Sequence, residues 1–214
     1  KSPLLGNPQT YLEALRDTGS LEHLVQSATG SSPTKHDLDV ARTFRVSFDR
    51  LDPDDPSDAL ARSVFALAAW FAPGEPIPRW LLKETADTAE GEIADKPFED
   101  ALIRLADLGL VERETEGGVT LHRLVAAFGN ADAVDDATRD AVEAAVATAA
   151  KRHNDREYPG PLAAWLTHLR AVAETAAARD AAKATQLLNS LGYHARMIAD
   201  LDGALTYYQR ALRI

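Results

Sequence analysis

Aspartates gather in the segment LDPDDPSD, residues 51–58, and they are potential ligands of a metal ion. Asp52, Asp54 and Asp55 carry carboxylates, which hard cations such as Ca²⁺ and Mg²⁺ prefer. The segment lacks the glycine and the terminal glutamate of a calcium-binding loop. Asp55 followed by Pro56 is instead typical of a capping residue and a proline in the first helical turn. The pattern therefore predicts a solvated turn in front of a helix.

The histidines and serines show no catalytic or zinc-binding pattern. His153, His168 and His194 have no partner at the short spacings of zinc ligands, and we expect surface or core positions, with His168 packed in a helical linker. Ser47 is not part of a Gly-x-Ser-x-Gly elbow, so a hydrolase triad has no support. The chain has no cysteine, which favours a cytoplasmic protein without disulfides. We expect no catalytic residue and no metal site, and hence no enzyme activity of this chain itself.

A phosphate-binding loop is also missing from the sequence. Such a loop reads G-x-x-x-x-G-K-[ST], because backbone amides of a glycine-rich turn surround the phosphates and a lysine reaches the terminal ones. No Gly-Lys dipeptide occurs in the 214 residues. We therefore expect the chain alone to bind no nucleotide cofactor.

The composition is that of a globular protein, with 45% hydrophobic and 26% charged residues. The formal net charge of −10 disfavours contact with nucleic acid and with anionic membranes. No apolar run is long enough to span a bilayer, and no basic and apolar leader opens the chain. We expect neither nucleic acid nor membrane as a partner. The chain begins without Met and ends within a helical pattern, so we expect it to be a piece of a longer protein.

The residues that any functional site must rely on lie in the stretch from Pro97 to Phe128. Apolar residues recur at helical spacing over 98–108, Gly109 ends that helix, and two short apolar runs flank Gly117 and Gly118. The pattern predicts a helix, a β-hairpin and a further helix over 122–128, the core of a winged helix. In a DNA-binding winged helix the helix over 98–108 would carry several cations, whereas its charged residues are the acidic Glu99, Asp100 and Asp107 and one arginine, Arg104.

Helices are predicted on both sides of this stretch. An apolar helix over 59–71 should form the centre of the core. The tryptophans Trp70, Trp80 and Trp165 are expected to be core anchors. The other predicted elements are a short helix over 77–82, an acidic loop over 90–95, a polar turn over 129–132, and helices over 136–151, 162–178, 181–198 and 202–212.

The last two helices form an antiparallel hairpin with small residues in its seam. The hairpin resembles a tetratricopeptide repeat, in which Gly192, Ala204 and Ala211 match small packing positions and Leu188, Leu191 and Tyr208 match large ones. Ala195 departs from the family, which usually carries an aromatic residue there. Repeats of this kind cannot bury their faces alone, so further repeats are expected to follow. An ordinary helical hairpin with alanines in its seam is the alternative interpretation.

A larger part of the chain resembles the STAND signalling ATPases, specifically bacterial NB-ARC proteins with tetratricopeptide repeats. The resemblance rests on Thr43–Leu82, on the winged stretch ending in LHRLVAAF and on the segment PLAAWLTHLRAVAETA. It implies a molecular switch: a P-loop ATPase domain, absent here, holds ADP or ATP with magnesium, the winged helix locks the ADP-bound resting state, and the repeats sense a protein or peptide ligand.

The family's Met-His-Asp motif lies near the end of the winged helix, where its histidine contacts the β-phosphate of ADP. Leu121-His122-Arg123 stands at that place in this sequence. The resemblance therefore implies that His122 senses the nucleotide once the ATPase domain is present. Arg123 in place of aspartate leaves open how the neighbourhood is held together, and a purely structural histidine is the alternative.

The chain is accordingly expected to be mainly α, with a winged helix followed by α-hairpins that lead into a tetratricopeptide-like solenoid. The predicted division is a helical subdomain remnant at 1–35, a winged-helix subdomain at 36–134, a helical linker at 135–184 and a truncated first repeat at 185–214. Two alternatives to a regulatory fragment of a STAND ATPase stay open: a winged-helix DNA-binding transcriptional regulator, and a stand-alone repeat scaffold for protein interactions.

Overall fold

The computed structural model describes residues 43–115, 117–132, 136–156, 160–179 and 181–214. These residues are mainly helical, with a small three-stranded antiparallel sheet, as predicted for the fold class. The predicted subdomain at 1–35 lies outside the described residues. After a helical segment at 43–48, the elements are α4 (Pro56–Ala68), β1 (Ile77–Pro78), α5 (Arg79–Glu90), α6 (Asp95–Asp107), β2 (Glu112–Arg113), β3 (Gly118–Thr120), α7 (Arg123–Asp132), α8 (Asp136–Asn154), α9 (Gly160–Ala163), α10 (Leu166–Ala178), α11 (Ala184–Met197) and α12 (Leu201–Ala211).

Helix α4 begins and packs as the sequence indicates. The side chain of Asp55 accepts hydrogen bonds from the N–H groups of Ser57 and Asp58, at 2.9 and 3.0 Å, and Pro56 opens the first turn. Six of its 13 residues are buried, and Val64 and Phe65 are fully inaccessible to solvent. The prediction that this helix is central to the core is confirmed.

The sheet contains one strand more than the predicted hairpin. Its order is β1-β3-β2, and Ile77 pairs with Val119. The prediction of a helix beginning at residue 77 is wrong for its first two residues, because the buried Ile77 and the adjacent Pro78 pair with β3. A proline has no N–H to donate, and an edge strand tolerates that loss. Helix α5 then runs on to Glu90, well beyond the predicted end at residue 82.

The helix, hairpin and helix predicted at the centre of the chain are present. Gly109 has a φ of +67°, a left-handed conformation that ends α6. Strands β2 and β3 pair antiparallel, with Glu112 opposite Thr120. The predicted polar turn at 129–132 is wrong, because α7 continues to Asp132. At Gly129 a Cβ atom would lie 2.7 Å from the Cβ of Ala69, so this glycine permits close contact between α7 and the end of the α4 segment.

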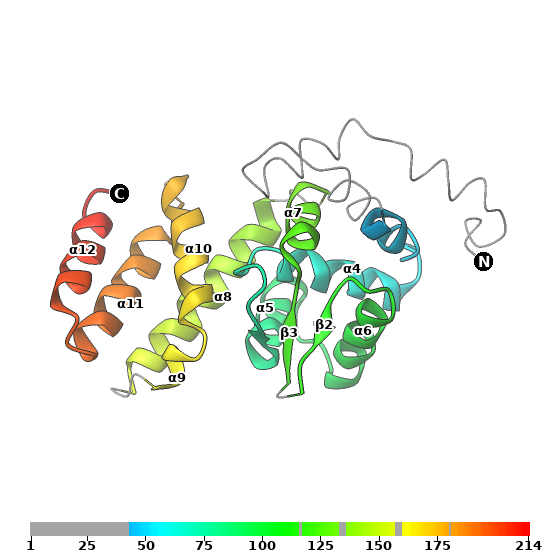
Figure 1. Ribbon diagram of the computed structural model, residues 1–214, viewed down its shortest axis with the longest axis horizontal. Coiled ribbons are helices and arrows are strands. Elements are labelled where there is room, and N and C mark those ends of the chain that lie inside the picture. The colour runs from blue at the N-terminus through cyan, green and yellow to red at the C-terminus, as the bar shows by residue number, and fades with distance from the viewer. Residues whose placement is uncertain (1–42, 116, 133–135, 157–159, 180) are drawn as a thin grey trace.

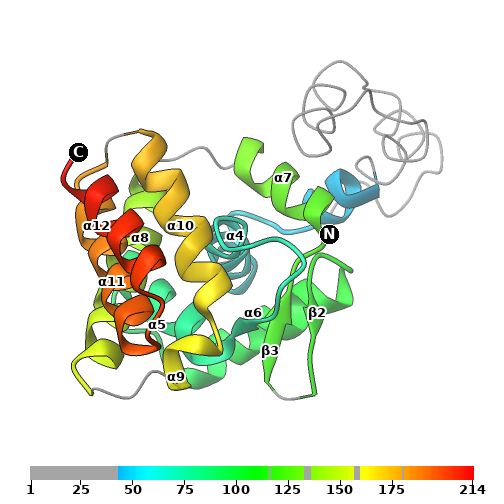
Figure 2. The same ribbon diagram turned by 60° about the vertical axis from the view of Figure 1, so that its left-hand side comes forward.

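Helices α8, α10, α11 and α12 lie side by side in a row that leads away from the sheet, with the C-terminus at the far end (Figure 1). In the rotated view α8, α11 and α12 overlap and α10 stands beside them, since α8, α10 and α11 contact one another (Figure 2). Helix α8 contacts both α5 and α11, so it joins the two halves of the molecule. The single helix predicted over 162–178 is wrong, since a turn separates α9 from α10. The turn predicted at Asp200 is present, and this residue caps α12 by accepting a hydrogen bond from the N–H of Gly203 at 2.9 Å.

One buried cluster of apolar side chains extends from Phe48 to Ala211. It passes without a break across the predicted subdomain boundaries at 135 and 185, and the division itself stays a prediction. In the part of the chain that the structure describes, no helix is both long and apolar enough to cross a membrane.

Candidate functional site

His122 lies two residues after the end of β3 and caps the N-terminus of α7. Its ring Nδ1 accepts a hydrogen bond from the N–H of Leu124 at 3.3 Å, and its carbonyl oxygen accepts one from the N–H of Ala126 at 3.0 Å. A neutral imidazole carries one proton, so an accepting Nδ1 places that proton on Nε2. The His122 side chain is exposed, and its Nε2–H has no acceptor among the described residues. His122 therefore combines a structural cap with a free donor.

A cavity of about 370 Å³ lies beside this donor. Its lining includes the apolar Phe44, Leu110 and Val125, the two basic residues His122 and Arg123, and the carboxylate of Glu112. The Arg123 side chain is exposed and makes no ion pair with any described residue. Free N–H groups and the helix dipole also make the start of a helix favourable for negative charge. His122 and Arg123 can donate hydrogen bonds to one anionic group, and Glu112 adds one negative charge to the same lining.

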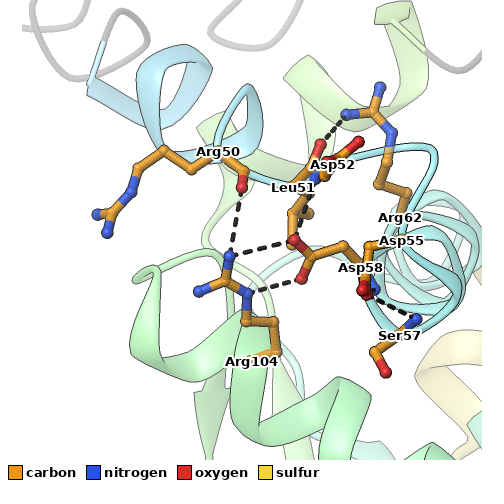
Figure 3. Close-up of polar contacts among 8 residues, drawn as sticks. All are labelled: Arg50, Leu51, Asp52, Asp55, Ser57, Asp58, Arg62 and Arg104. Carbon is orange, nitrogen blue, oxygen red and sulfur yellow. Dashed lines mark hydrogen bonds and ion pairs between the residues drawn. The ribbon is translucent and has the colours of Figure 1, made fainter. Parts of the chain in front are cut away.

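Arg104, the cation of the predicted recognition helix, is turned toward the protein. Its guanidinium donates to both carboxylate oxygens of Asp58, at 2.7 and 3.2 Å, and to the carbonyl oxygen of Arg50 at 3.2 Å (Figure 3). The carboxylate of Asp58 also accepts the N–H of Asp52. The hydrogen bond from Arg104 lowers the pKa of Asp58. Arg104 thus fastens α6 to the turn before α4, and α6 presents no free arginine for DNA.

Replacing Arg104 with glutamine should lower the free energy of unfolding by about 1 to 2 kcal/mol, since a charge-assisted pair that is partly exposed is lost. Because the pKa of Asp58 is lowered in the folded state, the pair stabilises the protein above pH 3.8 and less as the pH falls below that value. Urea titrations at pH 7 and pH 3 measure both effects. Lys96→Gln, which removes an exposed pair with Asp100, should cost less than about 0.5 kcal/mol. An equal loss in the two variants would contradict the assignment.

The acidic turn of residues 51–58 is built from local hydrogen bonds. Asp55 caps α4, as predicted, and the side chain of Asp52 accepts the N–H of Asp54 at 3.0 Å. Within the described ranges, no group of three or more His, Cys, Asp or Glu side chains lies close enough to hold a metal ion. The geometry accounts for these aspartates as capping and turn residues.

His168 is a core residue on α10, as predicted, and it bonds to a distant loop. Its Nδ1 accepts the N–H of Ala72 at 3.2 Å, and its Nε2 donates to the carbonyl oxygen of Pro76 at 3.0 Å. The ring also packs edge-on against Phe71. Burial lowers the pKa of His168, while the Pro76 carbonyl opposes that shift. The residue is therefore a neutral link between α10 and the loop that leads into β1.

The tryptophans differ in their burial. Trp165 is 1% exposed, which confirms a core anchor, whereas Trp80 is 36% exposed and Trp70 is half-buried. The Nε1–H of Trp165 donates to Nδ1 of His153 at 3.3 Å. The prediction of a core anchor is therefore wrong for Trp80, which borders a groove. Sequence reasoning missed this groove because its residues come from four separate parts of the chain.

Two further residues from the sequence analysis take no part in the site beside His122. His194 is buried on α11, and burial followed by the charge of Arg170 lowers its pKa. Ser47 lies in the helical segment 43–48 and is half-buried.

The residues predicted to pack in the last hairpin lie on α11 and α12. Leu188, Leu191, Gly192, Ala204 and Ala211 are buried, and Tyr208 is half-buried. A Cβ atom at Gly192 would lie only 2.7 Å from the ring of Tyr208, so the absent side chain lets the tyrosine pack on the helix. The smaller Ala195 is buried as well.

Comparisons with protein-family models, with curated proteins and with solved structures gave no match to this chain. The functional assignment therefore depends on the residues and on their geometry.

Proposed function

We propose that this chain is the regulatory part of a STAND-type signalling ATPase. The observation that carries the proposal is the position of His122 between the hairpin and α7, where it caps that helix. Its Nε2–H has no acceptor among the described residues. A histidine that senses a phosphate needs such a free donor. In this proposal the winged helix locks the ADP-bound resting state, and the repeats respond to a protein or peptide ligand in the cytoplasm.

The arrangement of elements supports a winged-helix interpretation. The order α4, β1, α5, α6, β2 and β3, with the sheet order β1-β3-β2, is the order expected when a helical core carries a hairpin wing. Arg104 is already bound to Asp58 within the protein, which disfavours the alternative of a DNA-binding regulator. The wing then serves an intramolecular contact.

The residues beside His122 fit one phosphate group but not a whole nucleotide. His122 and Arg123 offer donors and positive charge, while no Gly-Lys dipeptide exists to surround further phosphates. ADP or ATP with magnesium would accordingly be held by a P-loop domain of the parent protein, and His122 would add a single donor to it. Calorimetry with ADP and the isolated chain should show no tight binding.

Apolar side chains on the last hairpin support the proposal that further repeats follow. Ile198, Leu201 and Leu205 are 52%, 68% and 56% exposed, and all three lie at or after the end of α11. A helical hairpin in a solenoid covers such a face with its next neighbour. A stand-alone scaffold would need several repeats to form a binding surface, and the described residues contain one hairpin of this kind.

The test uses the full-length parent protein and two substitutions of His122. His122→Ala removes both the cap and the imidazole, whereas His122→Asn keeps a good capping side chain and removes only the imidazole. If His122 senses nucleotide, both variants should release bound ADP about tenfold faster or more, because a hydrogen bond to a charged group is worth about 1.5 to 3 kcal/mol. Release is followed with a fluorescent ADP analogue. Normal retention in His122→Asn together with faster release in His122→Ala would assign a structural role instead.

A further inference from the structure

A groove of about 1150 Å³ is separate from the cavity beside His122, and the two share no lining residue. Its walls come from α5, from the turn between β2 and β3, from the end of α8 and from the segment around α9. The volume exceeds that of most pockets for small molecules, which measure about 300 to 1,000 Å³. The groove is therefore suited to a longer ligand.

An exposed tryptophan forms the apolar part of the groove. Trp80 packs edge-on against the buried Trp165, with ring centroids 5.8 Å apart, and its ring is tilted against that of His153 at 5.3 Å. These contacts hold the indole in place while 36% of the residue stays accessible. Pro76 and Pro161 contribute rigid apolar wall. A fixed aromatic surface next to prolines can bind an apolar side chain at little cost in conformational entropy.

The charges that line the groove are opposite in sign to those of the whole chain. Three arginines and two glutamates face it, in a protein with a formal net charge of −10. Arg152 lies over the ring of Trp80 at 5.7 Å and pairs with Glu84 at 2.9 Å. Arg156 is exposed and has no ion pair with any described residue. The groove thus offers a free guanidinium beside its aromatic surface.

His153 adds a hydrogen-bond donor to the same wall. The residue is only 8% exposed, and its Nδ1 accepts the indole N–H of Trp165. The remaining proton is therefore on Nε2, for which the described residues supply no acceptor. Burial and the neighbouring Arg152 and Arg156 lower the pKa of His153, so the ring is neutral at pH 7. An oxygen of a bound chain would satisfy this donor.

We propose that this groove binds a linear acidic peptide, with an aromatic or other apolar side chain against Trp80 and a carboxylate at Arg156, the lining arginine that has no ion pair with a described residue. The peptide's backbone or a carboxylate accepts from Nε2 of His153. This site is separate from the cavity beside His122, so the proposal does not depend on the nucleotide-sensing role. A single-stranded nucleic acid also combines flat groups with negative charge, but the net charge of the chain opposes a polyanion of that length.

The test is fluorescence anisotropy with a fluorescein-labelled peptide of glutamates and aspartates around one central phenylalanine. We expect saturable binding, which weakens when lysines replace the acidic residues or alanine replaces the phenylalanine. Arg156→Glu should weaken the affinity about tenfold or more, corresponding to at least about 1.4 kcal/mol. Arg213→Glu makes the same change of charge at an exposed residue outside the groove, and it should bind as the unchanged chain does.

Trp80→Ala tests the aromatic contact, with circular dichroism to show that the variant is folded. Trp80 also contacts the buried Trp165, so Trp80→Ala changes core packing as well. Arg156→Glu changes an exposed residue and therefore tests the site without changing the core. Equal binding by the lysine peptide, equal weakening in Arg156→Glu and Arg213→Glu, or absence of saturation would each overturn the proposal. Tight binding of a labelled oligothymidylate, with no binding of the acidic peptide, would overturn it in favour of a nucleic acid.

Discussion

Replacing His168 with alanine should lower the free energy of unfolding by about 3 kcal/mol or more. The substitution leaves the buried N–H of Ala72 without its partner, which costs about 1 to 3 kcal/mol, and it also removes the hydrogen bond to the carbonyl oxygen of the exposed Pro76. It also opens a cavity at a residue that is 1% exposed and contacts Phe71. Since whole domains are stable by about 5 to 15 kcal/mol, this loss should be clear in a urea titration.

A conservative variant separates the hydrogen bonds from the packing. His168→Gln can still donate to the carbonyl oxygen of Pro76 but cannot reach the N–H of Ala72 in the same geometry. We expect it to lose roughly half as much stability as His168→Ala, because one hydrogen bond of about 1 kcal/mol is retained and less volume is removed. A loss below about 0.5 kcal/mol in both variants would show that His168 does not connect α10 to the loop.

The same residue should make stability depend on pH. In the unfolded chain His168 takes up a proton near its ordinary pKa of 6.5, whereas burial lowers the pKa in the folded protein. Below pH 6.5 the unfolded state therefore binds more protons, and the free energy of unfolding falls as the pH falls. His153 and His194 are shifted in the same direction. His168→Gln should consequently reduce this slope without abolishing it, as urea titrations between pH 7.5 and about 5 would measure.

Signals that act within a few residues were sufficient to place many of the elements. Asp55 with Pro56 starts a helix because the carboxylate satisfies free N–H groups of the first turn. Gly109 ends a helix because glycine, having no side chain, adopts a positive φ without strain. Asp200 starts the last helix by accepting a hydrogen bond from a backbone N–H, as Asp55 does. These positions could be predicted since the physical cause lies beside the residue in the sequence.

Elements that depend on distant partners could not be predicted. Residues 77–78 form a strand only because β3 supplies the pairing, and the sequence around them continues smoothly into a helix. Gly129 looks like a helix end, yet its missing side chain is what allows α7 to contact Ala69. Strand pairing at residues 77–78 and close packing at Gly129 depend on residues that are far away in the sequence, so local sequence preferences did not indicate them.

The candidate sites show the same division. His122 could be located from its place after the wing, but its cap on α7 required the hydrogen bond to Leu124. The groove at Trp80 had no sequence signal, because Trp80 contacts His153 and Trp165, which lie more than seventy positions later in the chain. Apolar neighbours of Trp80 in the sequence suggested a buried residue, whereas 36% of the residue is exposed.

Replacing Phe128 with alanine should be at least as damaging as the change at His168, with a loss of about 3 to 5 kcal/mol. Phe128 is 1% exposed and belongs to a group of three rings with Phe48 and Phe65. The ring centroids of Phe128 lie 5.5 Å from Phe48 and 6.3 Å from Phe65. The three rings come from the segment 43–48, from α4 and from α7, so their packing holds α7 against the other two.

His122 caps the start of α7, and Phe128 packs the same helix into the core. Phe128 should therefore also affect the proposed nucleotide sensor. Phe128→Leu keeps most of the apolar volume and should cost less than about 1.5 kcal/mol. In the full-length protein we expect Phe128→Ala, under conditions where it remains folded, to release ADP faster than Phe128→Leu, since a loosened α7 no longer holds the donor of His122 in place. Urea titration of the chain and ADP release from the parent measure the two effects separately. An equal loss in the free energy of unfolding for Phe128→Ala and Phe128→Leu would show that the aromatic ring does not anchor α7. An unchanged rate of ADP release in a clearly destabilised Phe128→Ala would show that this core does not control the sensor.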